Sequence, residues 1–315
     1  MGGTEGDSTL APQLPTPLRP GDRLLVIAPS GALRERQAFD QGVEIWRSWG
    51  FEVDLAPDFD QRWGYLAGTD AHRRQQLLEA LKAPEYRGIL CVRGGFGGTR
   101  LLEEWQWPEA EPKWLVGFSD ITSLLWSYAK YGVAGVHGPL LTTLAAEPDW
   151  SKERLRQLVT GETVAPIQGQ GWGGGVAEGR LLPANLTVAT HLLGTAHEPT
   201  LENVILAFED VTEAPYRIDR MLTYWRMLGR LYQVKGIALG RFSQCEPPPN
   251  VPSFSVAEVL GDRCADLGMP VVSDLPFGHD GENAALPVGL PARLDADQGT
   301  LSLLSLDQTV EIQTE

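Results

Sequence analysis

The sequence predicts an α/β protein whose first half folds around a mostly parallel sheet. Short apolar runs alternate with helical patterns from residue 23 to residue 130, and this alternation is typical of βαβ units. With 315 residues, the chain is long enough for a sizeable core and favours about two domains. Hydrophobic residues make up 43% of the chain and charged residues 21%, a balance typical of a soluble globular protein.

The elements of the first half are expected in a regular order. Buried strands are predicted by the apolar runs at 23–28, 51–55, 88–92 and 114–118. Helices are predicted between and after them, at 35–49, at 70–81, from about 99, and at 120–130. Thr69 or Asp70 would cap the second of these helices.

The pattern breaks up between residues 147 and 175, where a glycine-rich run at 169–175 indicates a connection between domains. Beyond it we expect further elements, namely strands at 203–208 and 236–239, helices at 218–228 and 255–267, and short strands from 288 to the end. The chain is therefore divided into four parts: a disordered lead (1–17), an α/β domain that carries the nucleophile (18–150), a linker (151–175) and a C-terminal domain (176–315).

Charge and cysteine content exclude several classes of function. The formal net charge is −15, which repels phosphate backbones and anionic membranes, so neither nucleic acid nor a membrane is an expected partner. The three cysteines are widely spaced and form no CxxC pair, which fits a reducing compartment. The N-terminus lacks the pattern of a signal peptide, and no apolar run reaches the roughly 20 residues of a membrane span. We therefore expect a cytoplasmic protein.

Ser119 is the candidate nucleophile because it lies where a predicted strand meets a predicted helix. At such a turn the hydroxyl stands above the sheet edge, and the N–H of Asp120 at the helix N-terminus can stabilise an oxyanion. Gly117 leaves room for the sharp turn, although the full G-x-S-x-G signature is absent. Serine is also a common helix N-cap, so both interpretations stay open on this segment alone.

A serine nucleophile needs a base, and two of the five histidines are candidates. His137 follows the nucleophile helix, and His279 lies in a polar loop bounded by glycines, a placement that suits a catalytic base. The other three show no HExxH spacing, so a zinc site is not expected: they are His72, His191 and His197.

The acid that would orient the base is Glu209, which ends an apolar run at 204–208. Carboxylates at strand ends enter clefts, but Glu209 could equally cap the helix that follows. Asp210 and Glu213 are its competitors. The pattern of residues alone does not separate these alternatives.

Five segments, in this order, resemble the LD-carboxypeptidase family: RGGFGGTRLL at 93–102, VGFSDIT at 116–122, HGP at 137–139, FEDVTEAPYRIDRML at 208–222 and GHDGENAALPVG at 278–289. Weaker matches occur at 21–31 and 64–70. The resemblance extends over nearly the whole chain, from about residue 21 to residue 289.

The resemblance implies a parallel α/β domain followed by a smaller, β-rich C-terminal domain. It also implies a triad of Ser119, His279 and Glu209, with the N–H groups of Asp120 and Gly95 as the oxyanion hole. The alternative for the turn at 94–98 is a tight βα turn without a ligand. No metal and no cofactor are implied.

Members of the family remove the terminal D-alanine from a murein tetrapeptide in cytoplasmic recycling of the cell wall, and they are commonly homodimers. The expected partners are thus a small muropeptide substrate and a second copy of the chain.

One segment departs from the family, since Pro183-Ala184 stands where two glycines are usual before Asn185-Leu186. The stiffer backbone puts the identity of the substrate in doubt. A related alternative is the immunity-type peptidase that cleaves a peptidyl adenylate, for which Trp172 could stack on the adenine. The alternative from another class is a non-catalytic muropeptide-binding protein.

Overall fold

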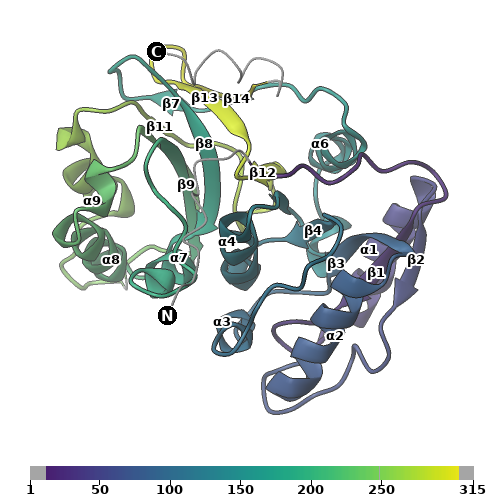
Figure 1. The fold of residues 1–315 in the computed structure, drawn as a ribbon. Helices are drawn as coiled ribbons and strands as arrows, with labels where there is room; N and C mark the ends of the chain where they lie inside the picture. Colours follow the sequence, from purple (N-terminus) through teal and green to yellow (C-terminus); the bar gives the residue numbers. More distant parts are fainter. Residues whose placement is uncertain (1–11, 248, 305–315) are drawn as a thin grey trace, which may run out of the picture.

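The computed structural model describes residues 12–247 and 249–304, which form two sheets linked through a central helix (Figure 1). The first sheet contains, in spatial order, β12 (Leu286–Val288), β5 (Gly135–His137), β4 (Trp114–Gly117), β3 (Tyr86–Cys91), β1 (Arg23–Ile27) and β2 (Glu52–Leu55). Neighbouring strands are parallel except β12, which runs antiparallel to β5. The predicted parallel sheet is confirmed.

Helices follow the first strands in the predicted alternation: α1 (Arg36–Ser48), α2 (Asp70–Lys82), α3 (Gly98–Leu102), the 3-10 turn η1 (Ser119–Ile121) and α4 (Thr122–Tyr131). The short strand β5 and the short helix α5 (Leu141–Leu144) were not predicted. Of the two candidate caps of α2, Thr69 is the one used, because its Oγ1 accepts a hydrogen bond from His72 N at 3.2 Å. No described helix combines the length and the apolar content that crossing a lipid bilayer requires.

The second sheet contains, in spatial order, β6 (Ile167–Gln168), β14 (Thr300–Leu303), β13 (Pro291–Asp295), β8 (Val176–Asn185), β9 (Val204–Val211), β10 (Gly236–Ser243), β11 (Val271–Ser273) and β7 (Gln170–Gly171). Strands β8 to β11 pair in parallel, and the outer strands pair antiparallel. Its helices are α7 (Leu186–Leu192), α8 (Pro215–Met227) and α9 (Val256–Cys264), with the 3-10 turns η2 (Arg230–Tyr232) and η3 (Ala265–Leu267). The β-rich character of the C-terminal part is confirmed.

The predicted linker contains a helix that the sequence pattern did not reveal. Helix α6 (Asp149–Thr160) buries Leu155, Leu158 and Val159, and it ends at Gly161 in the left-handed conformation. Arg154 lies on the same buried face and donates from its guanidinium to the carbonyl oxygens of residues 285 and 165. This charged residue interrupts the apolar stripe, so the helical periodicity was not recognised in the sequence. Arg154 can be buried because backbone carbonyls replace water as partners of its guanidinium.

Part of the predicted disordered lead is ordered. Gln13 donates its N–H to Gly132 O at 2.7 Å and accepts at its carbonyl from Ala134 N at 3.0 Å. Thr16 O accepts a hydrogen bond from Trp114 Nε1 at 3.0 Å. These contacts pin residues 12–17 along the first sheet, while residues 1–11 of the lead and 305–315 of the predicted terminal strands lie outside the described residues. The three boundaries between the four predicted parts stay predictions.

Helix α4, which follows the nucleophile candidate, lies between the two sheets (Figure 1). Every residue from Thr122 to Ala129 is buried, as expected of a helix enclosed on all sides. Thr122 Oγ1 accepts the N–H of Asn185, at the end of β8, at 3.0 Å. Trp126 Nε1 donates to Pro183 O at 2.9 Å. Two side-chain hydrogen bonds therefore fasten α4 to the end of β8.

We expect Thr122→Val to lower the free energy of unfolding by about 1–3 kcal/mol, because the isosteric change leaves the buried N–H of Asn185 unpaired. Denaturant unfolding of the variant beside wild type measures the loss. Thr160→Val serves as the control, since that hydroxyl bonds within the last turn of α6, and it should stay within about 0.5 kcal/mol. Equal stabilities of Thr122→Val and wild type would contradict the role of this bond.

Candidate active site

Ser119 lies at the carboxyl end of β4, in the strand–turn–helix setting that the sequence predicted. Its φ is 63°, in the left-handed region that costs a non-glycine residue about 1–3 kcal/mol. A Cβ at Gly117 would lie 3.0 Å from the Ile121 side chain and 3.2 Å from Cys91 Cβ, so a larger residue would require these neighbours to shift. No side-chain hydrogen bond caps η1 or α4, and the N-cap interpretation of Ser119 therefore fails.

Glu209 and His279 form a close pair. His279 Nδ1 and Glu209 Oε2 are 2.6 Å apart, although 70 positions separate them in the sequence. Glu209 is fully buried in β9, whereas the His279 side chain keeps 18% of its surface exposed. Burial lowers the pKa of His279, but the charge and the hydrogen bond of Glu209 raise it, and the net pKa lies above the ordinary value.

The loop that carries His279 is fixed from inside. Asn283 is fully buried; its Oδ1 accepts the N–H of Gly278 at 3.3 Å, and its own N–H donates to Glu147 Oε2 at 2.8 Å. Gly278 has φ 138°, and a Cβ there would lie 3.1 Å from Arg241 Cβ. The base is thus presented by a loop whose backbone is held rather than free.

Asn185 is a site residue that the sequence analysis did not single out. Its Nδ2 donates to Glu209 Oε1 at 3.3 Å and to Asp210 Oδ1 at 3.0 Å, and its Oδ1 accepts the N–H of Val188 to cap α7. One side chain thus supports both buried carboxylates. The available signal was its place in the Asn-Leu pair that follows the two departures from the family pattern.

Asp210, the competitor of Glu209, has a structural role instead. Its Oδ2 accepts from the backbone N–H and the hydroxyl of Thr187, at 2.9 Å and 2.8 Å. Burial and the neighbouring charge of Glu209 raise the pKa of Asp210 to about 6. Glu213, the next competitor, pairs with Arg217 at 3.5 Å on the surface side of α8.

His137, the other candidate base, is fully buried below the site. Both of its ring nitrogens lack a hydrogen-bond partner among the described residues, and burial lowers its pKa to about 3. Its ring lies between Phe118 and Phe277, at centroid distances of 5.8 Å and 6.4 Å. A neutral imidazole in this place packs rather than exchanges protons with a substrate.

Phe118 connects the nucleophile turn with the base. Its ring centroid lies 4.5 Å from that of His279, and Ser119 is the next residue. Among the described residues no hydrogen bond joins Ser119 Oγ to His279. The structure therefore brings Glu209 and His279 together and places Ser119 beside the aromatic residue against which the base rests.

The glycine-rich turn after β3 packs directly on Ser119. A Cβ at Gly94 would lie 3.0 Å from Ser119 Oγ and 3.5 Å from Asp120 N, so the two backbones approach closely. Gly95 follows with φ 110°. The oxyanion hole of Asp120 N and Gly95 N stays a prediction, with Gly94 as the residue of this turn in contact with Ser119.

A cavity of about 610 Å³ adjoins His279. Trp172 lines it with its indole held by a 2.9 Å bond from Nε1 to Ser273 Oγ. Arg241 also lines this cavity. Its Nε lies 3.3 Å from Asp280 Oδ2, and its Nη1 lies 3.6 Å from Asp274 Oδ1. The sequence analysis did not consider Arg241, because isolated arginines carry no pattern.

Two family models match the chain: the LD-carboxypeptidase N-terminal domain over residues 24–138 and the LD-carboxypeptidase C-terminal domain over residues 178–294. Together they cover more than half of the chain.

Relatives match over nearly their whole length. A Synechocystis protein that carries a provisional carboxypeptidase name is 61% identical over 291 residues, which are 92% of this chain and 97% of its own. The murein tetrapeptide carboxypeptidase of Pseudomonas aeruginosa is 31% identical over 88% of this chain and 94% of its own.

Solved structures agree with this picture. The muramoyltetrapeptide carboxypeptidase of Oxalobacter formigenes has a TM-score of 0.80 and 28% identity, over 89% of this chain and 97% of that one. The microcin C7 self-immunity protein MccF, in complex with glutamyl sulfamoyl guanosine, has a TM-score of 0.82 at 21% identity, over 93% and 99%. The latter shows likeness of fold alone.

We expect Glu209→Gln to lower the pKa of His279 from above the ordinary histidine value to below it. The substitution removes the negative charge that raises this pKa and leaves the burial that lowers it. NMR titration of the imidazole signals measures the change without any substrate.

Asp210→Asn is the matched control, because that carboxylate bonds Thr187 and Asn185 and its charge raises the pKa of His279 less than Glu209 does. In this variant the pKa of His279 should stay above the ordinary value. Equal downward shifts in both variants would show that the pair does not govern the base.

Proposed function

The chain belongs to the LD-carboxypeptidase family of peptidases, and from this we propose that it is a serine carboxypeptidase that releases the terminal D-alanine of a murein tetrapeptide. The observation that carries the proposal is the 2.6 Å contact between His279 Nδ1 and Glu209 Oε2. The ring of His279 packs on Phe118, the residue that precedes Ser119 in its strained turn. A base oriented by a buried acid is what a serine nucleophile requires.

In the proposed reaction, His279 accepts the proton of Ser119 as the hydroxyl oxygen attacks the carbonyl carbon of the scissile amide. Glu209 holds the proton on Nδ1, so that Nε2 is the basic atom, and it stabilises the imidazolium that forms. The tetrahedral intermediate collapses when His279 returns its proton to the amide nitrogen, and D-alanine leaves. Water, deprotonated by His279, then hydrolyses the acyl-enzyme and frees Ser119.

The proposed oxyanion hole consists of backbone N–H groups at Asp120 and in the glycine turn. Asp120 N lies in the first turn of η1. The glycine turn approaches from the other strand, since Gly94 packs against Ser119 Oγ, the oxygen that would attack the substrate. A single donor of this kind typically contributes about 2.7–4 kcal/mol of transition-state stabilisation. We assign the second donor to Gly95.

A second candidate activity is cleavage of a peptide joined to a nucleotide. Trp172 favours it, because a fixed indole in the cavity beside His279 offers a face on which a base could stack. The tetrapeptide remains the first choice because the murein tetrapeptide carboxypeptidase of Pseudomonas aeruginosa is 31% identical to this chain, whereas MccF is 21% identical. With this substrate, the chain would serve the recycling of cell-wall peptides and, like other members of the family, act as a homodimer.

We expect purified wild type to release D-alanine from a murein tetrapeptide, and we expect Ser119→Ala to reduce kcat by about 10⁶-fold, which removes measurable release. Coupled detection of free D-alanine measures both rates. The control is Ser127→Ala, which changes a buried serine of α4 that bonds Trp107 and His197, and it should keep the wild-type rate.

Release that persists in Ser119→Ala would refute the nucleophile. If neither protein releases D-alanine, the murein substrate is wrong, and an aminoacyl sulfamoyl nucleoside is the next compound to bind and assay.

A further inference from the structure

We propose that the carboxylate of Asp120 is a positioning residue that holds the backbone of the oxyanion hole in register with Ser119. This inference rests on the proposed function and deepens it. The N–H of Asp120 would face the reacting oxygen, while the side chain of the same residue bonds the turns that surround it.

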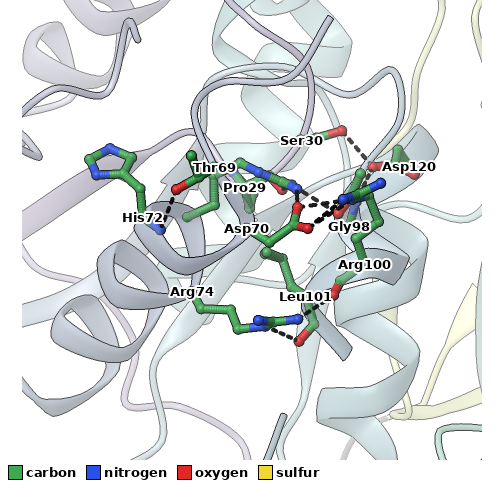
Figure 2. A network of polar contacts seen from close by, with 12 residues as sticks. Pro29, Ser30, Thr69, Asp70, His72, Arg74, Gly98, Arg100, Leu101 and Asp120 are labelled. Carbon is green, nitrogen blue, oxygen red and sulfur yellow. Dashed lines mark hydrogen bonds and ion pairs between the residues drawn. The ribbon is translucent and has the colours of Figure 1, made fainter. Parts of the chain in front are cut away.

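The carboxylate is bound on two sides. Asp120 Oδ2 accepts the hydroxyl of Ser30 at 2.5 Å and the backbone N–H of Gly98 at 2.7 Å, as Figure 2 shows. Asp120 is 3% exposed and Ser30 is fully buried. Solvent therefore cannot replace either partner without opening the packing.

The three bonded segments come from three adjacent strands. Ser30 follows β1, Gly98 ends the turn after β3, and Asp120 follows β4, and these strands are neighbours in the first sheet. Because parallel strands place their carboxyl ends at one edge, a single carboxylate reaches all three connections. The three turns are thereby fixed relative to one another.

A second group of contacts holds two of the same turns from the side of α2. Arg73, fully buried, donates from Nη1 to Pro29 O at 2.5 Å and to Gly97 O at 2.8 Å. Asp70 pairs with Arg73 at 2.5 Å and with Arg100 at 2.6 Å (Figure 2). The turns after β1 and after β3 are thus anchored to α2 as well as to Asp120.

The fit at the nucleophile leaves little freedom. A Cβ at Gly94 would lie 2.9 Å from Ser119 Cβ, and a Cβ at Gly31 would lie 2.8 Å from Gly94 O. Gly31 N also donates to Gly94 O at 3.1 Å. If the bonds to Asp120 were lost, the turn at 94–98 could move away from Ser119, and misplacement by about 1 Å can lower a rate about 100-fold.

Packing alone does not explain an acid at this position. A buried carboxylate must be desolvated, which an apolar residue of similar size would avoid. Burial raises the pKa of Asp120, and the hydrogen bonds from Ser30 and Gly98 and the charge of Arg73 oppose this. An acid that is buried beside a developing oxyanion, with each contact directed at a surrounding turn, indicates a requirement of the reaction.

The experiment compares Asp120→Ala, Asp120→Asn and Ser30→Ala with wild type in D-alanine release from the tetrapeptide. We expect Asp120→Ala to lower kcat about 100-fold with KM within about threefold, since binding is retained and geometry is lost. Asp120→Asn should recover to within about tenfold, because the amide oxygen, in the place of Oδ2, can accept from both Gly98 N and the Ser30 hydroxyl. Ser30→Ala, which removes one bond, should fall between them.

The matched control is Lys113→Met. Lys113 is also buried, but it lies before β4, at the opposite end of that strand, where it donates to Ala80 O and Ala83 O at the end of α2. This variant should lose stability and keep the wild-type kcat. A kcat within threefold of wild type in Asp120→Ala, or a raised KM with unchanged kcat, would overturn the proposal; if that variant does not fold, a wild-type kcat in Ser30→Ala decides against it.

Hydrogen exchange separates this proposal from the proposed function. The N–H of Gly98 should exchange at least tenfold faster in Asp120→Ala than in wild type, with β9 unchanged as internal reference. If wild type releases no D-alanine, the murein substrate is wrong, and hydrogen exchange alone tests the positioning role of Asp120. Unchanged exchange at Gly98 in Asp120→Ala overturns this role, and faster exchange supports it.

Discussion

The packing of α4 against the end of β8 is the constraint on which the site depends. The nucleophile turn belongs to the first sheet and the acid to the second, so no local segment of chain can bring them together. The bond from Asn185 N to Thr122 Oγ1 joins the start of α4 to the residue that also donates to Glu209. One asparagine thus connects the turn of Ser119 with Glu209, so a shift of either sheet would move both residues.

Buried carboxylates are common in this site, and each is balanced differently. Glu209 has the imidazole and one amide, Asp210 has the N-terminus of α7, and Asp120 has a hydroxyl and a backbone N–H. Buried acids are tolerated when they accept hydrogen bonds, because the donors replace the lost water. The differences in partner explain how adjacent acids of one strand, Glu209 and Asp210, serve unlike purposes.

The sequence predicted the four strands of the first sheet that have longer apolar runs, β1 to β4, and it missed the two short strands at one edge, β5 and β12. Helix α2 was predicted from its spacing and its cap, whereas α6 was missed because Arg154 is inside its apolar face. For the site, strand ends and glycine-bounded turns pointed to Ser119, Glu209 and His279, but the choice among competitors came from a family resemblance. Asn185 and Ser30 carry no pattern of their own, since their importance arises from partners 24 and 90 positions away.

Strand β12 completes the first sheet only near the end of the chain. It pairs its residues 286–288 with β5, and within a few residues the chain returns to the other sheet as β13. During synthesis from the N-terminus, the edge of β5 therefore remains open until almost the whole polypeptide has emerged from the ribosome. An unpaired strand edge of this kind is a site for wrong association between chains. The first sheet thus receives its last strand from the final third of the chain, and a fragment cut at the middle of the chain would leave the edge of β5 without this partner.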